Sequence, residues 1–538
     1  GVGQRDYWVF ENYLSYNDKF GDHTVSTMVG TSAEKERYET VNASKEGLVN
    51  NDANQQIINA ATKNPAASGS VSYHTMNSYF GRVFYSYADK YMITANIRWD
   101  GSSNFADKHR WGVFPSVSGG WNFREESFIK DVVGDWFSQG KFRAAWGEIG
   151  NQNISSGAYL TRYGNSTYYL LGNSMTPWLS GGRTNVGNPD LRWETTRQLD
   201  FGLDLAFFNS ALKFNIDYFD RKTSDMLVQV PMPAAIGLPN TPWSNAGSVK
   251  NRGFEFVLDY HGKIGNDFSY NIAGNISTYK NKVLSLGGGT NIPGKTHLGN
   301  QVNTMIEPGK PIGYFYGYKM DGVFQTQEEI NNYRGGPDNT IIMPTAEPGD
   351  LKFVDLNGDG KLGEEDRTMI GNPHPDFTFG LTLSGEYKGF DLSMFFQGSV
   401  GNDILNILKY DIYSGTGWYN APKDIFDKFW TGPGSTNENF AISANSRDNL
   451  TMSEWYIENG SYVRLKNVTL GYTFPKQWVQ KLTVQNLRLF VAAQNLFTIT
   501  SYSGLDPELG NSNPAFMGID MGWYPQARSF MVGLSLKL

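Results

Sequence analysis

The stretch FDLSMFFQGSV, residues 390–400, alternates apolar and polar side chains over most of its length. Its apolar set comprises Phe390, Leu392, Met394 and Phe396. Successive side chains of a β-strand point to opposite faces of a sheet, so this spacing predicts a strand with one apolar and one polar face. A soluble antiparallel sheet, with one face on a core and the other in water, would fit this single run equally well.

The same alternation recurs along the chain, in residues 91–99, 199–207, 212–218, 254–260 and 530–538. These runs exceed the roughly 5–6 residues of an average soluble strand. The strands that these runs mark continue for roughly 9–14 residues, and a tilted strand needs roughly 9–11 to cross hydrocarbon. Aromatic residues gather at their ends, as in the interfacial girdles of outer-membrane barrels. We therefore expect an all-β, transmembrane, antiparallel up-and-down β-barrel.

Short and long connections between these runs alternate. We predict tight turns at residues 17–21, 88–89, 209–210 and 387–389, and long segments at 39–76, 150–193, 225–248, 281–375 and 401–460. Short periplasmic turns and long extracellular loops are typical of outer-membrane barrels. The whole chain, residues 1–538, reads as about fifteen strands. Plugged transporters have about 22, so we expect the N-terminal plug and first strands to be absent here.

Composition excludes several other classes of protein. The formal net charge of −7 gives no basic surface for nucleic acid, and cysteine is absent. No run approaches the roughly 20 apolar residues of a membrane-spanning helix. No zinc-type HExxH or GxSxG nucleophile motif occurs, so we expect no enzyme. We expect membrane lipid or lipopolysaccharide to surround the wall of the barrel.

One acidic loop, residues 355–366, has the spacing of an EF-hand calcium loop. Asp355, Asn357 and Asp359 occupy ligand positions 1, 3 and 5, the carbonyl of Lys361 occupies position 7, and Asp366 occupies position 12. We expect Ca²⁺ here, with Mg²⁺ as the alternative because aspartate at position 12 reaches less far than glutamate. The alternative is a turn rich in Asp and Asn that binds no metal ion.

Aromatic side chains in the long segments are candidates for binding cargo. They are Trp178, Trp243, Trp418 and Tyr419. Aromatic faces stack on sugar rings or peptide side chains, and their polar tips form hydrogen bonds. Packing of these residues against one another, for loop order alone, is the competing interpretation. Helical patterns at Asp403–Ile412 and Asp424–Trp430 predict that the 401–460 loop is folded.

Eight ordered stretches carry a family resemblance. Among them are FPSVSGGWNFREESF from Phe114, NPDLRWETTRQLDFGLDLAFF from Asn188, GDLKFVDLNGDGKLGEEDRTMIGNPHPDFTFG from Gly349 and LRLFVAAQNLFTITSYSGLDPE from Leu487. The chain resembles SusC/RagA-type TonB-dependent transporters of Bacteroidetes, over nearly its whole length.

This resemblance implies a function that the residues alone do not. It implies TonB-driven import of a nutrient across a Gram-negative outer membrane, with oligosaccharide as the first expected cargo and peptide as the second. It also implies a SusD-like surface lipoprotein as a lid, dimers of transporter–lid pairs, and a TonB-contacting segment outside this chain. From the residues alone, a passive porin, an outer-membrane adhesin or a secreted calcium-stabilised β binding protein stays open.

Overall fold

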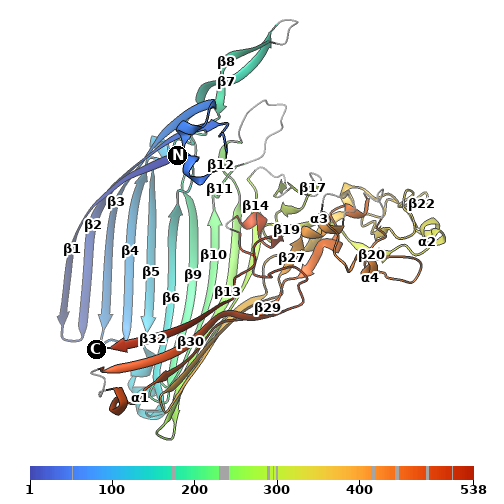
Figure 1. Ribbon diagram of the computed structural model, residues 1–538. Helices are drawn as coiled ribbons and strands as arrows, with labels where there is room; N and C mark the ends of the chain where they lie inside the picture. Colours follow the sequence, from blue (N-terminus) through green and yellow to red (C-terminus); the bar gives the residue numbers. More distant parts are fainter. Residues whose placement is uncertain are drawn as a thin grey trace. The chain divides into compact units, whose positions relative to one another are not determined.

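The largest element of the fold is a 15-stranded antiparallel sheet (Figure 1). The computed structural model describes residues 1–538 except 51, 172–175, 230–240, 288–290, 295, 298–300, 414–418, 443–447, 480–483, 512 and 538. The all-β fold and the count of about fifteen strands are therefore confirmed. Within the described residues, every helix is too short or too polar to traverse a bilayer.

The main sheet follows chain order, so each strand bonds to the next one named. Its strands are β1 Val2–Phe20, β2 His23–Glu46, β3 Lys63–Tyr87, β4 Tyr91–Ser102, β5 Trp111–Trp121, β6 Phe137–Asn151, β9 Glu194–Phe207, β10 Leu212–Ser224, β13 Ser248–Ile264, β14 Phe268–Ser285, β25 Phe377–Tyr387, β26 Phe390–Val400, β29 Tyr462–Thr473, β30 Asn486–Thr500 and β32 Ser529–Lys537. This sequential antiparallel order is that of an up-and-down sheet.

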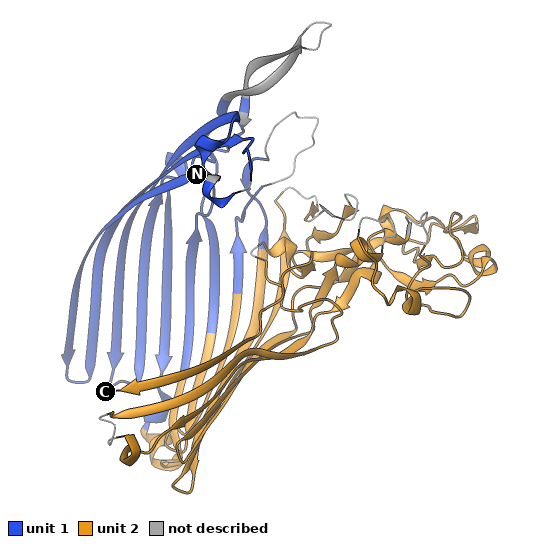
Figure 2. Cartoon of the chain, in the orientation of Figure 1, with its two compact units in different colours: residues 1–126, 142–200, 221–248 blue, residues 127–141, 201–220, 249–538 orange. Residues whose placement is uncertain are grey.

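The chain divides into two compact units (Figure 2). The first comprises residues 1–126, 142–200 and 221–248, and the second comprises 127–141, 201–220 and 249–538. The first unit also contains β7 Arg162–Leu171, β8 Thr176–Asn185, β11 Leu227–Gln229 and β12 Trp243–Asn245. It has a small core of its own, made of Phe105, Ile154, Ala158, Leu191, Trp193 and Leu227.

The second unit carries a folded insertion that we call the loop body, residues 301–376, 401–460 and 501–522. Its strands are β17 Gln301–Val302, β18 Thr304–Ile306, β19 Tyr314–Tyr318, β20 Met320–Val323, β21 Arg334–Gly335, β22 Thr340–Ile341, β23 Leu351–Phe353, β24 Arg367–Gly371, β27 Asp403–Asn406, β28 Ile457–Asn459 and β31 Ile519–Asp520. The short strands β15 Ile292–Pro293 and β16 Thr296–His297 precede it.

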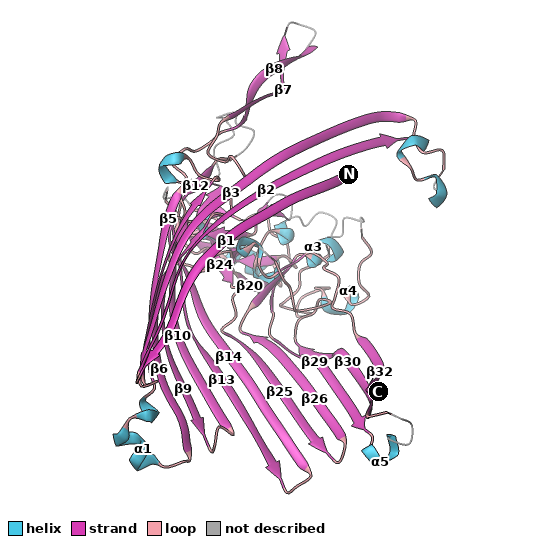
Figure 3. Ribbon diagram, turned by 90° about the vertical axis from the view of Figure 1, so that its left-hand side faces the viewer, coloured by secondary structure: helices cyan, strands magenta, loops and turns pink. Residues whose placement is uncertain are grey.

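Helices are few and short. The α-helices are α1 Ser127–Val133, α2 Gln327–Asn332, α3 Leu408–Tyr413, α4 Ile425–Lys428 and α5 Lys476–Val479. The 3-10 turns are η1 Ala53–Gln55, η2 Ile58–Ala60, η3 Asp107–His109, η4 Phe123–Glu125, η6 Glu364–Asp366, η7 Asp448–Leu450, η8 Glu454–Tyr456 and η10 Pro514–Phe516. Figure 3 shows α5 beyond the strand ends that also carry the short turns of the second unit.

The predicted tight turns at 88–89, 209–210 and 387–389 are confirmed. Ala88, Asp89, Asn209 and Ser210 all have positive φ, as does Lys388. Such backbone is costly for most residues but is tolerated in short hairpin turns, which here comprise residues 88–90, 208–211 and 388–389. The sharp reversals therefore leave adjacent strands in register from their first residues.

Three predictions about connections are wrong. The tight turn expected at 17–21 lies at residues 21–22, because β1 continues to Phe20, which pairs with His23. The long segment expected at 39–76 is mostly strand, because β2 runs to Glu46 and β3 begins at Lys63, and their backbones pair as far as Glu46↔Lys63. Residues there are small and polar, so apolar alternation could not show this pairing. The helical pattern expected at 403–412 is half strand, since β27 pairs with β28 and only α3 is helical.

The sheet exposes apolar side chains at every second position. On β4, Tyr91, Ile93, Ile97 and Trp99 are 47–54% exposed. A water-facing sheet would bury this face on a core, whereas a membrane wall presents it to lipid. On β32 the same spacing leaves Phe530, Val532, Leu534 and Leu536 exposed.

Candidate functional site

The second unit has a polar sheet face opposite its apolar one. Asp391 on β26 and Arg488 on β30 form a two-pronged ion pair on that face, with Arg488 Nε 2.9 Å from one carboxylate oxygen. Gly471 on β29 lies between them, and a Cβ there would come within 2.5 Å of both groups. A residue larger than glycine would therefore separate the pair, so this face is built to hold fixed charge.

The loop body is packed around an apolar core. Its largest fully buried side chains include Tyr314, Phe315, Phe324, Phe353, Phe440 and Tyr456. Trp455 meets Phe440 edge-on at 4.9 Å between ring centroids. Lys409 donates to the carbonyl of Trp455 and pairs with Glu458 at 3.0 Å. A packed core of this kind makes the loop a fixed surface rather than a mobile one.

A buried ion network joins the loop body to β29. The guanidinium of Arg464 donates to Asp506, Glu508 and the hydroxyl of Thr498. Its side chain is 4% exposed, and that of Asp506 is 8% exposed. Burial alone would raise the pKa of Asp506, but hydrogen bonds from Arg464 and from two backbone amides outweigh it and lower that pKa. The network therefore fixes residues 501–526 against the strand.

The acidic loop folds into a series of local turns. Asp355 accepts hydrogen bonds from the amides of Gly358 and Gly360, at 2.7 and 2.8 Å. Asn357 and Asp359 each accept from the amide two residues further on. These Asx-type turns orient the side-chain oxygens at positions 1, 3 and 5. The sharp bend is possible because Gly360 has φ +83°.

Asp366 closes the acidic loop from inside. It is fully buried, and its two oxygens accept the amides of Leu356, Asn357 and Gly363. One oxygen therefore receives two amides and the other receives one. Within the part of the chain that the structure describes, no three His, Asp or Glu side chains converge as a metal site. The same loop also contains the side-chain amide oxygen of Asn357 and the backbone carbonyl oxygen of Lys361.

The structure describes the side chains of two of the four candidate cargo aromatics, Trp243 and Tyr419. Trp243 lies on β12, is partly buried and packs against the small core of the first unit. Tyr419 is 64% exposed. Trp178 lies on β8, where side chains are outside the described part, and Trp418 is itself outside the described residues.

Several polar anchors were not predicted from the sequence. Arg464 and Asp506 are 42 residues apart, and His374 joins the hydroxyl of Tyr279 to the carbonyl of Ile312. His374 and Asp506 fall within the stretches that carry the family resemblance, which mark these residues but not their contacts. Such a signal cannot identify the partner.

The chain matches a family model described as "TonB dependent receptor-like, beta-barrel" over residues 2–496. TonB-dependent receptor P3 of Formosa agariphila is 36% identical, over 98% of this chain and 52% of the relative. TonB-dependent receptor SusC of Bacteroides thetaiotaomicron is 31% identical, over 98% of this chain and 49% of the relative. The chain thus spans about half the length of the curated relatives it matches.

Solved structures show the same fold. A structure of the RagAB peptide transporter matches with a TM-score of 0.80 at 22% identity, over 99% of this chain and 56% of that one. The same importer in an "open-open" state matches with a TM-score of 0.79.

Proposed function

Since this chain belongs to the TonB-dependent receptor β-barrel family of the Gram-negative outer membrane, we propose that the protein containing it imports a nutrient with energy from TonB. The observation that carries the proposal is the family match over residues 2–496. The wall agrees with it, with exposed apolar residues on one face and fixed charges such as Asp391 and Arg488 on the other. Lipid covers the first face and water the second.

We propose oligosaccharide as the first cargo and peptide as the second. The resemblance to SusC/RagA-type transporters is the basis for oligosaccharide, and the fold shared with the RagAB peptide transporter supports peptide. The packed loop body supports a binding role, because binding residues are most effective on loops held by a rigid scaffold. A SusD-like lipoprotein is the proposed lid over this body, in dimers of transporter–lid pairs.

Growth will distinguish these cargo classes. A strain lacking the full-length protein should fail to grow on its cognate oligosaccharides as sole carbon source, and complementation should restore growth. Loss confined to peptides would select the second cargo. A complemented strain without TonB should also fail, since a passive porin needs no energy input. Undiminished uptake in that strain would contradict active import.

Loss of cargo affinity should identify the aromatic contacts. Alanine at Trp178, Trp418 and Tyr419 should each weaken cargo binding several-fold, because a stacked ring contributes about 0.5–1.5 kcal/mol. Calorimetry on the purified full-length protein would measure this. Trp243→Ala is the matched comparison, since its ring packs against a core cluster. Unchanged affinity in all three variants would return them to a purely structural role.

We propose that the 355–366 loop binds Ca²⁺, or Mg²⁺, through Asp355, Asn357, Asp359, the Lys361 carbonyl and Asp366. The turns that orient the first three side chains support this set, as does the all-oxygen donor chemistry that both ions prefer. The ion would stiffen one edge of the loop body.

Chelation should open this loop. Treating the full-length protein with EDTA is expected to speed proteolysis within residues 350–366 about ten-fold or more, because binding energy is linked to the folded loop. Added Ca²⁺ should reverse the effect. Asp359→Asn should behave like the chelated protein, and Asp338→Asn, outside the loop, should not. A cleavage rate that ignores both EDTA and Ca²⁺ would remove the metal.

A further inference from the structure

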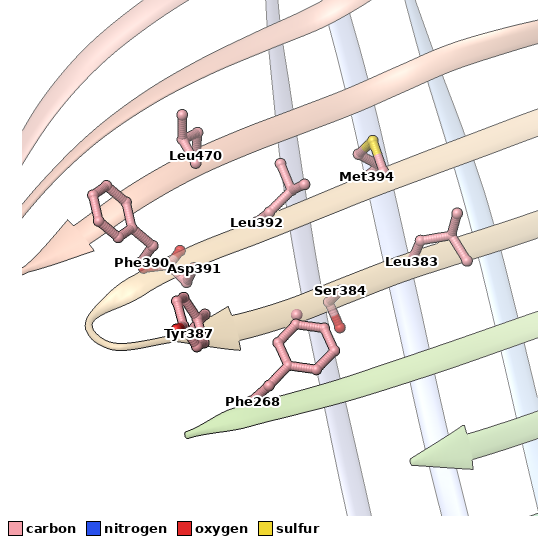
Figure 4. Close-up of a pocket in the computed structure, with 10 residues that line it drawn as sticks. Phe268, Leu383, Ser384, Tyr387, Phe390, Asp391, Leu392, Met394 and Leu470 are labelled. Atoms are coloured by element: carbon pink, nitrogen blue, oxygen red, sulfur yellow. The ribbon is translucent and has the colours of Figure 1, made fainter. Parts of the chain in front are cut away.

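The turn ends of the second unit carry a row of aromatic residues on the apolar face of the wall. The strand register aligns them as Phe268 of β14, Tyr387 of β25, Phe390 of β26 and Tyr472 of β29. Figure 4 shows Phe268, Tyr387 and Phe390 at the turn ends of their strands. Aromatic rows of this kind lie where the head groups of a bilayer meet its hydrocarbon. The row therefore marks the membrane boundary on the short-turn side.

A helical segment, made of α1 and residues 134–136, lies on this same side of the sheet. The carbonyl of Trp136 accepts a hydrogen bond of 2.6 Å from the amide of Phe208, in the turn between β9 and β10. The hydroxyl of Ser138 accepts another, of 3.0 Å, from the amide of Ser210. In the antiparallel sheet, the β9–β10 turn shares its side with the β25–β26 turn. Figure 3 shows α1 at the turn ends of β6 and β9, on the side away from β29 and β30.

Trp136 joins this segment to the apolar face of the wall. Its ring stacks on that of Phe207 of β9, with 5.7 Å between centroids and 14° between planes. Side chains alternate between the two faces of a strand, so Phe207 shares its face with the exposed Phe201. Asp204 lies on the opposite, polar face, where it accepts a hydrogen bond from Asn215. The exposed ring of Trp136 therefore continues the apolar face beyond the strand ends.

The helix α1 exposes two large apolar side chains. Phe128 is 66% exposed and Val132 is 81% exposed, and their four-residue spacing places them on one side of the helix. Ile129 and Val133, on the neighbouring stripe, are half-buried. A helix of seven residues is too short to be stable alone in water, so its position depends on the contacts of both stripes.

We propose that α1 and Trp136 lie in the head-group region of the periplasmic leaflet, with Phe128 and Val132 against acyl chains. The lipid that covers the wall is the partner, because the stacked ring of Trp136 makes the segment continuous with that face. An amphipathic helix is stable with its apolar side at the boundary of head groups and acyl chains. Lys130 and Asp131 have opposite charges, so the contact needs no anionic lipid. The proposal rests on the outer-membrane position of the wall and is independent of the cargo.

Spin-label accessibility measures whether lipid or water meets this helix. The full-length protein, with one introduced cysteine as its only cysteine, carries a nitroxide in vesicles of phosphatidylethanolamine and phosphatidylglycerol. Collisions with oxygen, which concentrates among acyl chains, are compared with collisions with a water-soluble nickel chelate. Val132→Cys should give an oxygen-to-nickel ratio several-fold above that of Asp131→Cys, the matched control next to it on the helix. Leu470→Cys, on the apolar face of β29, is the reference for a label in lipid (Figure 4).

Phe128→Cys repeats the measurement on the same stripe if Val132→Cys fails to assemble, as judged by heat-modifiable migration. Replacing phosphatidylglycerol by phosphatidylcholine should leave the ratio unchanged, since the helix carries balanced charge. Equal ratios at the apolar positions and at Asp131 would place the stripe in water, open to a soluble protein partner, and would overturn the proposal. A ratio that collapses without phosphatidylglycerol would overturn the apolar contact and assign the helix to anionic head groups.

Discussion

Replacing Arg464 by methionine is expected to release residues 501–526 from β29 and to destabilise the protein by about 3–5 kcal/mol. The guanidinium is almost completely buried and serves Asp506 and Glu508 together. Methionine fills similar volume but leaves the buried Asp506 carboxylate without its counter-charge. Removing one member of a buried ion pair costs more than the pair itself contributes, because the remaining charge cannot regain water.

Limited proteolysis and urea unfolding in detergent would measure the two consequences separately. Lys466→Met is the matched control, since Lys466 also pairs with Glu508 but is more exposed, at 18%. Its expected cost is at most about 1 kcal/mol. Equal effects of the two variants would show that the buried network does not hold the segment.

Acid should reproduce part of the Arg464 effect. The pKa of Asp506 is lowered in the folded protein, so its stabilising contribution is complete above its unfolded pKa of about 3.9. That contribution is lost as the pH falls through the lower folded pKa. Protease sensitivity of residues 501–526 is therefore expected to rise only below about pH 4. Arg464→Met should remove this pH dependence.

The wall could be predicted from sequence because its physics is local. An apolar residue at every second position, as at Phe390, Leu392 and Met394, faces lipid whatever its partners are. The same rule fails for residues 42–46 of β2, which pair with β3 although their sequence, NASKE, carries no apolar alternation. A strand pairing that is not accompanied by side-chain alternation cannot be predicted from a single sequence.

The loop body shows a different limit. The spacing of Asp355, Asn357 and Asp359 predicts a calcium loop; these residues form local turns, and metal binding there stays a prediction. The core of the loop body, which contains Met452 and Ile519, is formed by contacts between segments more than 80 residues apart in the chain. These segments have an ordinary composition. Local sequence patterns predict individual turns and strands, but only tertiary contacts determine how these elements pack together.

Phe353→Ala should loosen the whole loop body and leave the wall intact. Phe353 is 1% exposed, and its ring lies 5.5 Å from that of Tyr318. Its carbonyl accepts the hydroxyl of Tyr333. Truncating a buried phenylalanine costs about 3–5 kcal/mol, because the cavity does not fully collapse. Hydrogen exchange in residues 314–371 should therefore rise by orders of magnitude, while heat-modifiable migration of the barrel stays unchanged.

The nearby Leu356→Ala provides the control, because Leu356 is 44% exposed and its truncation should cost no more than about 0.5 kcal/mol. If both variants exchanged alike, the loop body would be a collection of independent loops and could not present a fixed surface to cargo or lid. If Phe353→Ala alone loosens the body and also weakens cargo uptake, rigidity of this insertion is part of import. The barrel would then supply the path, and the packed insertion the recognition.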